Sequence, residues 1–293
     1  MFSKEPTLIA VRDVESLRRR VKAWRRDNLS VALVPTMGAL HKGHITLMER
    51  AKKMADRVVA TVFVNPKQFG PKEDFDAYPR QENADFELLN AAGVHLMFAP
   101  DIAAMYPPGF STAVEIKGIT DVLDGVARPG HFNGVATVVT KLLLQTLPDI
   151  ALFGEKDYQQ LQVIHRLVTD LNIPVDIIGV PTVREADGLA MSSRNAYLTP
   201  AERAVAPLLY AAITAAAQAI AGGDDIAKTT ADAQAALVGK GFGKVDYVDA
   251  RHADTLAPLT SKDEPGRILA AAHLGRTRLI DNVAIPRGAD SPK

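Results

Sequence analysis

Two histidines stand three positions apart in a short loop, where they could take part in phosphate chemistry. The loop follows a strand pattern, precedes a helical pattern and reads P-T-M-G-A-L-H-K-G-H over residues 35–44. Gly38 and Gly43 permit tight turns and close approach of a ligand. A helix that begins near His44 directs free N–H groups toward the loop, which suits a phosphate. His41 and His44 could then hydrogen-bond phosphate oxygens as charge develops. The alternative, a structural pair at a helix cap or metal ligands, is disfavoured by this context.

A lysine follows a second strand pattern, in the segment F-G-E-K-D-Y-Q-Q of residues 153–160. Lys156 lies just beyond the strand and close to the next helix, a suitable place to neutralise phosphate. Gln160 lies about one helical turn after Asp157, so both side chains can face the same pocket. The alternative is an ordinary helix start that Asp157 caps.

Two hydroxyl side chains stand beside an arginine in G-L-A-M-S-S-R-N, residues 188–195. Ser192, Ser193 and Arg194 could form a mobile clamp for an anion. The segment falls near an expected domain junction, where a closing lid would be useful. The alternative is a polar loop that leads into a helix begun by Thr199.

Two further segments could form the walls of a substrate pocket. Residues 64–71 read V-N-P-K-Q-F-G-P and offer Gln68 as a hydrogen-bonding anchor. Residues 128–135 read R-P-G-H-F-N-G-V and offer Arg128 and His131 before a helix rich in β-branched residues. The apolar candidates for the same pocket, which could instead pack in the core, are Val138, Val139 and Leu142.

Strand and helix patterns alternate through the first part of the chain. The predicted strands cover residues 31–35, 58–64, 94–98, 149–153 and 175–180. The predicted helices lie near residues 14–27, 44–55, 81–92, 132–147 and 157–171. Continuous apolar strands that alternate with helices predict an α/β domain with a doubly wound parallel sheet. Ligands of such sheets bind at the carboxyl ends of the strands, where the loops described above lie.

The pattern changes after residue 184. We expect an alanine-rich helix over residues 201–221, a second helix over 226–239, and short strands over 245–250, 267–272 and 277–282. These elements predict a smaller α+β domain. We therefore divide the chain into residues 1–183 and 184–293, and expect a disordered tail at residues 288–293.

Composition describes a globular protein with a large core, because 47% of the 293 residues are hydrophobic and 23% are charged. Lys and Arg number 34, as do Asp and Glu, so we expect no nucleic-acid or membrane partner. The absence of cysteine excludes thiolate catalysis and fits a cytoplasmic protein. Apolar runs fall short of the roughly 18 residues of a membrane span, and early charges argue against a signal peptide.

The basic segment 18–26 has the apolar spacing of an amphipathic helix, which favours a solvated face over a nucleic-acid site.

Six segments, in family order, together resemble the pantothenate synthetase family. A looser match is R-T-R-L-I-D-N at residues 276–282. The six are P-T-M-G-A-L-H-K-G-H (35–44), F-V-N-P-K-Q-F-G-P (63–71), Y-P-R (78–80), R-P-G-H-F-N-G-V-A-T-V-V (128–139), F-G-E-K-D-Y-Q-Q (153–160) and G-L-A-M-S-S-R-N-A-Y-L (188–198).

The resemblance implies a Rossmann-like nucleotidyltransferase domain, a smaller C-terminal lid domain and a homodimer. It implies an AMP-forming pantoate–β-alanine ligase of pantothenate and coenzyme A biosynthesis, with ATP as a substrate and Mg²⁺ as its partner ion. The carboxylate of pantoate would attack the α-phosphate of ATP, and the amine of β-alanine would then displace AMP from pantoyl-adenylate. Such chemistry needs positioning and charge stabilisation more than a protein nucleophile.

The resemblance also assigns residues by motif position. His44, His41 and Lys156 are similar to catalytic residues. Gln68 and Gln160 are similar to the pantoate anchors, with Gln68 also near β-alanine, while the metal ligands stay unassigned. The residues that correspond to the ATP site are Met37, Gly38, Ala39, Leu40, His41, Lys42, Gly43, His44, Gly154, Glu155, Lys156, Asp157, Val183, Met191, Ser192, Ser193 and Arg194.

One departure is Lys67, where an uncharged residue is expected in many relatives. Its side chain could point to solvent or could attract the carboxylate substrates. Other functions stay open on the residues alone: another nucleotidyltransferase with the same histidine motif, a tRNA-charging enzyme, or a nucleotide-sensing module. A dinucleotide-dependent dehydrogenase is disfavoured, since no Gly-x-Gly-x-x-Gly follows the early strand.

Overall fold

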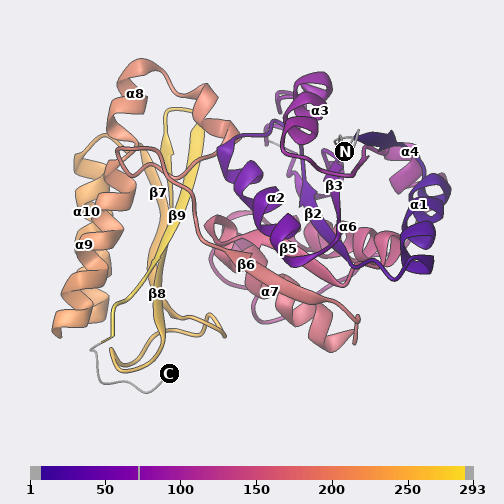
Figure 1. The fold of residues 1–293 in the computed structure, drawn as a ribbon. Coiled ribbons are helices and arrows are strands. Elements are labelled where there is room, and N and C mark those ends of the chain that lie inside the picture. Colours follow the sequence, from indigo (N-terminus) through magenta and orange to yellow (C-terminus); the bar gives the residue numbers. More distant parts are fainter. Residues whose placement is uncertain (1–7, 72, 288–293) are drawn as a thin grey trace.

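The computed structural model describes residues 8–71 and 73–287, and the tail expected at residues 288–293 lies outside them. Figure 1 shows two units side by side, each built around its own sheet. One unit holds a six-stranded sheet, and the other holds a three-stranded sheet covered by long helices. The predicted α/β fold with a smaller C-terminal α+β unit is therefore confirmed. The boundary between residues 183 and 184 stays a prediction.

The large sheet is parallel throughout, and its strand order is β1-β4-β3-β2-β5-β6. The order reverses between β2 and β5, so the carboxyl ends of these neighbours flank a crevice where ligands bind in such sheets. Five of its six strands were predicted, and the short edge strand β1 was not. The strands are β1 (Ile9–Val11), β2 (Val31–Thr36), β3 (Arg57–Val62), β4 (Leu96–Phe98), β5 (Ile150–Gly154) and β6 (Asp176–Val180).

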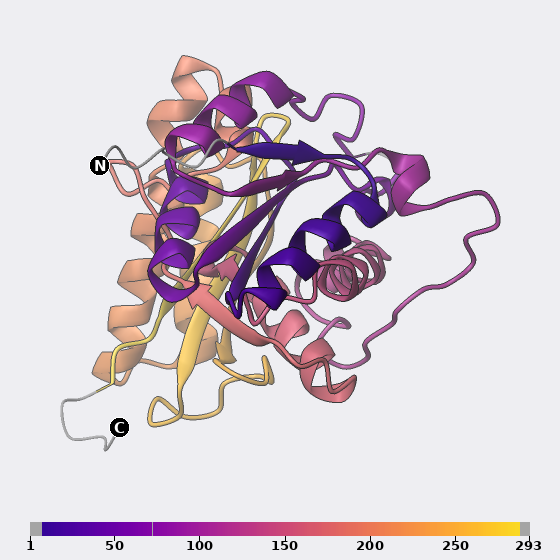
Figure 2. The ribbon, with the colours of Figure 1, turned by 45° about the vertical axis from the view of Figure 1, so that its right-hand side comes forward.

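Helices cover both faces of this sheet, as a doubly wound fold requires. Leu33 and Phe153 belong to the core beneath one helical layer, while Val34 and Leu152 belong to the core on the other face. Figure 2 shows α1 beside α6 in the first layer. That layer comprises α1 (Val14–Arg26), α6 (His131–Thr146) and α7 (Tyr158–Asp170). The opposite layer comprises α2 (Lys42–Met54) and α3 (Glu82–Ala91).

Helix α1 confirms the amphipathic interpretation of the basic segment. Asp13 caps the helix, because its side chain accepts the N–H of Ser16 at 2.7 Å. Leu17 and Val21 are buried against the sheet. The arginines of residues 18–20 are exposed, so they form the solvated face of the helix.

The smaller unit is an antiparallel sheet of order β7-β8-β9 backed by helices. Its elements are α8 (Pro200–Val205), α9 (Leu208–Gly222), α10 (Ile226–Gly239), β7 (Lys244–His252), β8 (Gly266–Leu274) and β9 (Thr277–Ala284). The prediction of a single helix over residues 201–221 is wrong in one respect, because the chain forms two helices with a break at Ala206 and Pro207. Proline lacks an N–H and its ring clashes with the preceding turn, which explains the break. Gly223, with φ of 108°, ends α9 as expected.

Short elements were not predicted. They are the helices α4 (Ile102–Met105) and α5 (Asp124–Ala127) and the 3₁₀ turns η1 (Pro66–Gln68), η2 (Glu155–Asp157) and η3 (Ser193–Tyr197). A single turn has too little hydrophobic periodicity to be recognised in a sequence.

Among the described residues, the helical stretch Pro200–Gly222 is apolar and long enough, by composition and length, to cross a membrane. Its Leu209, Ile213 and Ile220 are fully or almost fully buried in the core of the smaller unit. A core helix meets the same test of length and composition, so the stretch is weak evidence for a membrane span.

Helix α6 approaches the turn η1 backbone to backbone, and Gly134 makes this contact possible. Its carbonyl accepts the side-chain N–H of Asn65 at 3.1 Å. A Cβ atom at this position would lie 2.1 Å from the carbonyl oxygen of Lys67 and 2.6 Å from the backbone nitrogen of Gln68. The position of Gln68 therefore depends on the absence of a side chain at Gly134.

We expect Gly134→Ala to lower the free energy of unfolding by about 1–3 kcal/mol, the range for overpacking, because backbone atoms cannot move aside cheaply. The matched control is Gly239→Ala near the end of α10, where a Cβ would meet no atom within 4 Å. The control should be neutral or stabilising by up to about 1 kcal/mol. Urea denaturation of both variants measures the difference, and equal stabilities would contradict the argument.

Candidate active site

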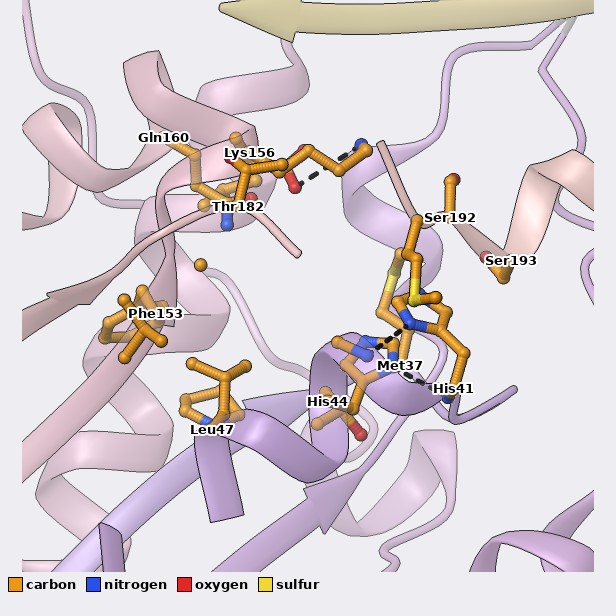
Figure 3. Close-up of a pocket in the computed structure, with 18 of the residues that line it drawn as sticks. Met37, His41, His44, Leu47, Phe153, Lys156, Gln160, Thr182, Ser192 and Ser193 are labelled. Atoms are coloured by element: carbon orange, nitrogen blue, oxygen red, sulfur yellow. Dashed lines mark hydrogen bonds and ion pairs between the residues drawn. The ribbon is translucent and has the colours of Figure 1, made fainter. Parts of the chain in front are cut away.

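The candidate site is a cavity of about 210 Å³ at the carboxyl ends of β2 and β5. A cleft of about 730 Å³ adjoins it, and Lys156, Asp157, Ser192 and Arg194 line both. The structure thus brings together motifs that lie far apart in the sequence (Figure 3). The predicted residues that line the cavity are Met37, His41, Gly43, His44, Gln68, Gly154, Lys156, Asp157, Gln160, Val183, Met191, Ser192, Ser193 and Arg194.

A buried carboxylate holds the loop between β2 and α2. Asp85 is 1% exposed, and it accepts the N–H groups of Ala39 at 3.0 Å and Leu40 at 2.8 Å. Ala39 has φ of 50°, an unfavourable backbone conformation that these hydrogen bonds help to hold. A Cβ atom on Gly38 would lie 2.8 Å from Asp85 Oδ2. Gly38, Ala39 and Leu40 were predicted for the ATP site, but they do not line the cavity. The contacts of Ala39 and Leu40 with Asp85 instead set the shape of the loop.

The two histidines form one hydrogen-bonded cap at the start of α2. The N–H of His41 donates to Nδ1 of His44 at 3.2 Å, and the N–H of Gly43 donates to Nδ1 of His41 at 3.2 Å. An accepting nitrogen carries no proton, so each neutral ring carries its proton on Nε2. The ring centroids are 4.1 Å apart, and both residues line the cavity. Each histidine therefore keeps one Nε2–H available as a donor.

Burial and a nearby cation keep both rings neutral. Burial lowers the pKa of His41 to about 4, and the positive charge of Lys156 acts in the same direction. Burial lowers the pKa of His44 to about 3, with further contributions from His41 and Lys156. At neutral pH the pair therefore supplies hydrogen-bond donors rather than charges.

Lys156 brings a cationic side chain to the cavity. It lies on η2 immediately after β5, and its Nζ is 3.7 Å from Oδ2 of Asp157. This contact is long, so the ammonium can also bind an anion. Figure 3 shows Lys156 and Gln160 on one side of the cavity and the histidine pair on another.

Two further residues predicted for the ATP site, Glu155 and Lys42, also lie outside the cavity lining. Glu155 turns toward the smaller unit and forms an ion pair with Arg267 at 3.2 Å. Lys42 is exposed on the first turn of α2. Their neighbours in the sequence do line the cavity, because consecutive residues of a helical turn point in different directions.

Gln68 is nearly buried and fixed on several sides. Its Oε1 accepts from Nδ2 of Asn65 at 3.0 Å, and its Nε2 lies 3.0 Å from the sulfur of Met37. Tyr106 in turn donates its hydroxyl proton to Oδ1 of Asn65 at 2.8 Å. This chain of contacts sets the orientation of the Gln68 amide at the cavity wall.

Arg128 and His131 stand behind Gln68, outside the cavity lining. The backbone carbonyl of Gln68 lies 2.8 Å from Nδ1 of His131, and Nε2 of that ring lies 2.9 Å from Arg128. A guanidinium only donates, so Nε2 accepts and Nδ1 donates. Burial lowers the pKa of His131 to about 4. Neither residue lines the cavity, although Arg128, which pairs with Glu73 at 2.6 Å, lines the adjoining cleft, so their place in a substrate wall stays a prediction.

The serine–arginine segment closes against the loop that follows Gln68. Arg194 donates two hydrogen bonds to the carboxylate of Asp74, at 2.9 and 3.0 Å. The hydroxyls of Ser193 and Tyr78 lie 3.2 Å apart. Ser192 accepts the N–H of Arg194 at 3.2 Å. These contacts join the two segments at the edge of the cavity.

Sequence reasoning missed several lining residues. Pro181 and Thr182 directly follow β6, so the rule that ligands bind at strand ends could have found them. Asn65 and Tyr78 stand inside motifs that were recognised but given no role. The apolar candidates that do line the cavity are Val138, Val139 and Leu142.

Lys67 is exposed, in agreement with the first of the two alternatives considered from the sequence, and its ammonium also lies near two aromatic rings. Its Nζ lies 5.2 Å from the ring centre of Tyr106 and 5.4 Å from that of Phe110. Such contacts are favourable cation–π interactions. Lys67 does not line the cavity, so its charge is directed to these rings rather than to a carboxylate substrate.

Comparison with known proteins shows which family the chain resembles along its length. The family model for pantoate-beta-alanine ligase matches residues 9–284. The chain is 61% identical to pantothenate synthetase of Paramagnetospirillum magneticum over 94% of this chain and 97% of the relative. It is 56% identical to that of Caulobacter vibrioides over 94% and 98%.

Solved structures give the same result. The pantothenate synthetase of Thermus thermophilus superposes with a TM-score of 0.89 at 46% identity, covering 94% of this chain and 99% of that one. The pantoate-beta-alanine ligase of Francisella tularensis, solved with beta-gamma ATP and beta-alanine, superposes with a TM-score of 0.80 at 34% identity, covering 96% and 99%. The chain belongs to the pantoate-beta-alanine ligase family.

Proposed function

We propose that the protein condenses pantoate with β-alanine at the expense of ATP, giving pantothenate, AMP and pyrophosphate. The observation that carries this proposal is the convergence of His41, His44, Lys156 and Arg194 on one cavity that Gln68 also lines. A similar protein has been solved with beta-gamma ATP and beta-alanine, which supports the choice of substrates. The proposed pathway is pantothenate and coenzyme A biosynthesis.

The first step forms pantoyl-adenylate. A carboxylate oxygen of pantoate attacks the α-phosphorus of ATP, and the bond from that phosphorus to the bridging oxygen breaks as pyrophosphate leaves. Negative charge grows on the phosphate oxygens during this exchange, so fixed donors and cations accelerate it. The Nε2–H groups of His41 and His44 and the ammonium of Lys156 are the proposed donors. Gln68 and Gln160 are the proposed anchors of pantoate.

The second step forms the amide. The neutral amine of β-alanine attacks the acyl carbon, the acyl–oxygen bond breaks, AMP leaves with that oxygen, and the amine nitrogen loses a proton. The Gln68 amide is proposed to contact β-alanine as well. The proposed ATP site comprises Met37–Gly43 with His44, Gly154–Asp157, Val183 and Met191–Arg194, with the loop residues Gly38, Ala39 and Leu40 acting through backbone shape.

The proposed Mg²⁺ fits an ion carried by the triphosphate. Among the residues that the structure describes, no group of three or more His, Asp or Glu side chains is arranged to hold a metal. Magnesium commonly binds through one or two carboxylates, water and substrate phosphates. The half-exposed Asp157, which lines the cavity and the cleft, could supply one such carboxylate. The ion would neutralise phosphate charge during adenylation.

We further propose a cytoplasmic homodimer. The exposed apolar side chains Leu144 and Leu147, at the end of α6, and Leu171, after α7, lie on the large unit and are about half exposed. Contacts between identical copies would cover such side chains. Light scattering in solution tests this assembly.

The function is tested by omitting one substrate. ATP and D-pantoate alone should give a burst of pyrophosphate close to the amount of enzyme, because adenylation does not involve the amine. His44→Ala and Lys156→Ala should each slow the burst by roughly 10²–10³-fold, as expected for the loss of one preorganised donor. Lys141→Ala is the matched lysine control, since Lys141 lies near the ring of Phe110 and not in the cavity lining. A burst that strictly requires β-alanine would exclude the two-step scheme.

Stability should depend on pH through the buried histidines. The unfolded chain binds protons near the ordinary histidine pKa of 6.5, whereas folded His41 and His44 bind them only near pH 4 and 3. The free energy of unfolding should therefore be highest above pH 6.5 and fall as the pH is lowered toward 4. Urea denaturation measures this slope. His41→Gln combined with His44→Gln should reduce it, and an unchanged slope would contradict the assignment.

The serine–arginine segment is proposed to seal the cavity. Replacing Ser192 and Ser193 with alanine and Arg194 with glutamine should slow adenylation and let pantoyl-adenylate leak to water. The ratio of AMP to pantothenate at saturating β-alanine should then exceed one. Asp74→Asn weakens the Arg194 contact without removing the clamp, so its ratio should lie between those of wild type and the triple variant. If the triple variant is slowed but its ratio of AMP to pantothenate stays at one, the segment binds phosphate and does not seal the cavity.

A further inference from the structure

All but the first residue of the segment R-T-R-L-I-D-N belong to β9, the edge strand of the smaller sheet, and its last residue contacts the large unit. Asn282 is 3% exposed. Its Nδ2 lies 2.8 Å from the carbonyl oxygen of Glu155 and 3.0 Å from that of Lys156. One side chain of the smaller unit thus binds two successive peptide groups of the turn that carries Lys156.

The orientation of the Asn282 amide follows from its partners. Nε of Arg267 lies 2.6 Å from Oδ1 of Asn282. A guanidinium only donates and a carbonyl only accepts, so the amide oxygen must face Arg267 and the amide nitrogen must face the two carbonyls. Both ends of the side chain are therefore satisfied, and a reversed amide would lose all three hydrogen bonds.

Arg267 holds the same turn from a second direction. It forms an ion pair with Glu155 at 3.2 Å, and its guanidinium lies 3.9 Å from the ring centre of Tyr158. Glu155 and Tyr158 flank Lys156 and Asp157 in the chain. Residues of β8 and β9 thus hold the turn η2 in two ways. Asn282 of β9 binds its backbone carbonyls, and Arg267 of β8 contacts the side chains of Glu155 and Tyr158.

The residue before Asn282 reaches a second segment of the cavity. Asp281 accepts two hydrogen bonds from Arg184, at 2.6 and 2.8 Å. Arg184 directly follows Val183, which lines the cavity. Adjacent residues of β9 therefore bind two of the segments that form the cavity wall.

We propose that Asn282 is a positioning residue for Lys156, so that the smaller unit places the catalytic charge as well as covering the site. This inference rests on the proposed role of Lys156. The ammonium stands at the end of a flexible four-carbon stem, and its nearest carboxylate is 3.7 Å away, so the backbone of η2 decides which volume the ammonium can reach. A displacement of about 1 Å at a reacting group can lower a rate by about 10²-fold.

The test is a double-mutant cycle on the pyrophosphate burst with ATP and D-pantoate. Asn282→Ala should slow the burst by about 10- to 100-fold through its rate constant at saturating substrates. In a Lys156→Ala background the same substitution should change the rate by less than about twofold, because the group that it positions is already absent. A merely structural role would give the same factor in both backgrounds.

Arg278→Gln is the matched control on the same strand. Arg278 also crosses between the units, to Asp124 at 2.6 Å, but it does not contact the turn of Lys156. Its effect on the burst should be the same with and without Lys156. Asn282→Ser has a smaller side chain that keeps one donor, so it should lose less activity than Asn282→Ala. This variant replaces Asn282→Ala in the cycle if the alanine variant does not fold.

The outcomes separate the two proposals. A normal burst in Lys156→Ala removes the proposed role of Lys156 and, with it, this inference. A slowed Lys156→Ala with either an unaffected Asn282 variant or additive effects overturns only the positioning role. A slowed Asn282 variant whose effect vanishes in the Lys156→Ala background supports it.

Discussion

The pairing of β2 with β5 is the constraint on which the rest of the site depends. The register joins Ala32 to Ile150 and Leu33 to Ala151, so the two strands end at the same edge of the sheet. The histidine loop follows one strand and the turn of Lys156 follows the other. A shift in this register would move the His44 loop relative to Lys156, and no movement of side chains alone could restore their arrangement around the cavity. The strong burial of both strands therefore serves the chemistry as well as the stability of the fold.

Much of the large unit could be predicted because its strands are apolar without interruption. Burial on both faces removes the alternation seen in half-exposed strands, and the flanking loops then mark the strand ends. The same logic placed the loop of His41 and the turn of Lys156 at one edge of the sheet. Strand β1 was not predicted, because a three-residue strand at the edge of a sheet is too short to show a hydrophobic pattern. Pro207 was visible in the sequence, but the alanine-rich run around it masked the break between α8 and α9.

What the sequence could not provide is the direction of side chains and the contacts between distant segments. Arg128 and His131 belong to a recognised motif, yet they support Gln68 from behind, because the end of α5 and the start of α6 present them to the turn η1 and not to the cavity. Asp85 belongs to no recognised motif, and only the fold reveals that it accepts hydrogen bonds from the backbone of the loop that carries His41. Such second-layer contacts depend on tertiary packing, and no local spacing encodes them.

The cavity lining combines charged side chains, among them Lys156 and Arg194, with two neutral histidine donors, and burial explains why the histidines are neutral. A histidine cation beside Lys156 would meet both desolvation and repulsion, and these effects hold the pKa values of His41 and His44 far below neutrality. A neutral Nε2–H still directs a dipole at developing negative charge without the penalty of a second buried ion. Arg194 is treated differently, because Asp74 already matches its charge. A phosphate that binds Arg194 must therefore compete with Asp74, and one that binds Lys156 must compete with Asp157, whose Oδ2 lies 3.7 Å from the ammonium.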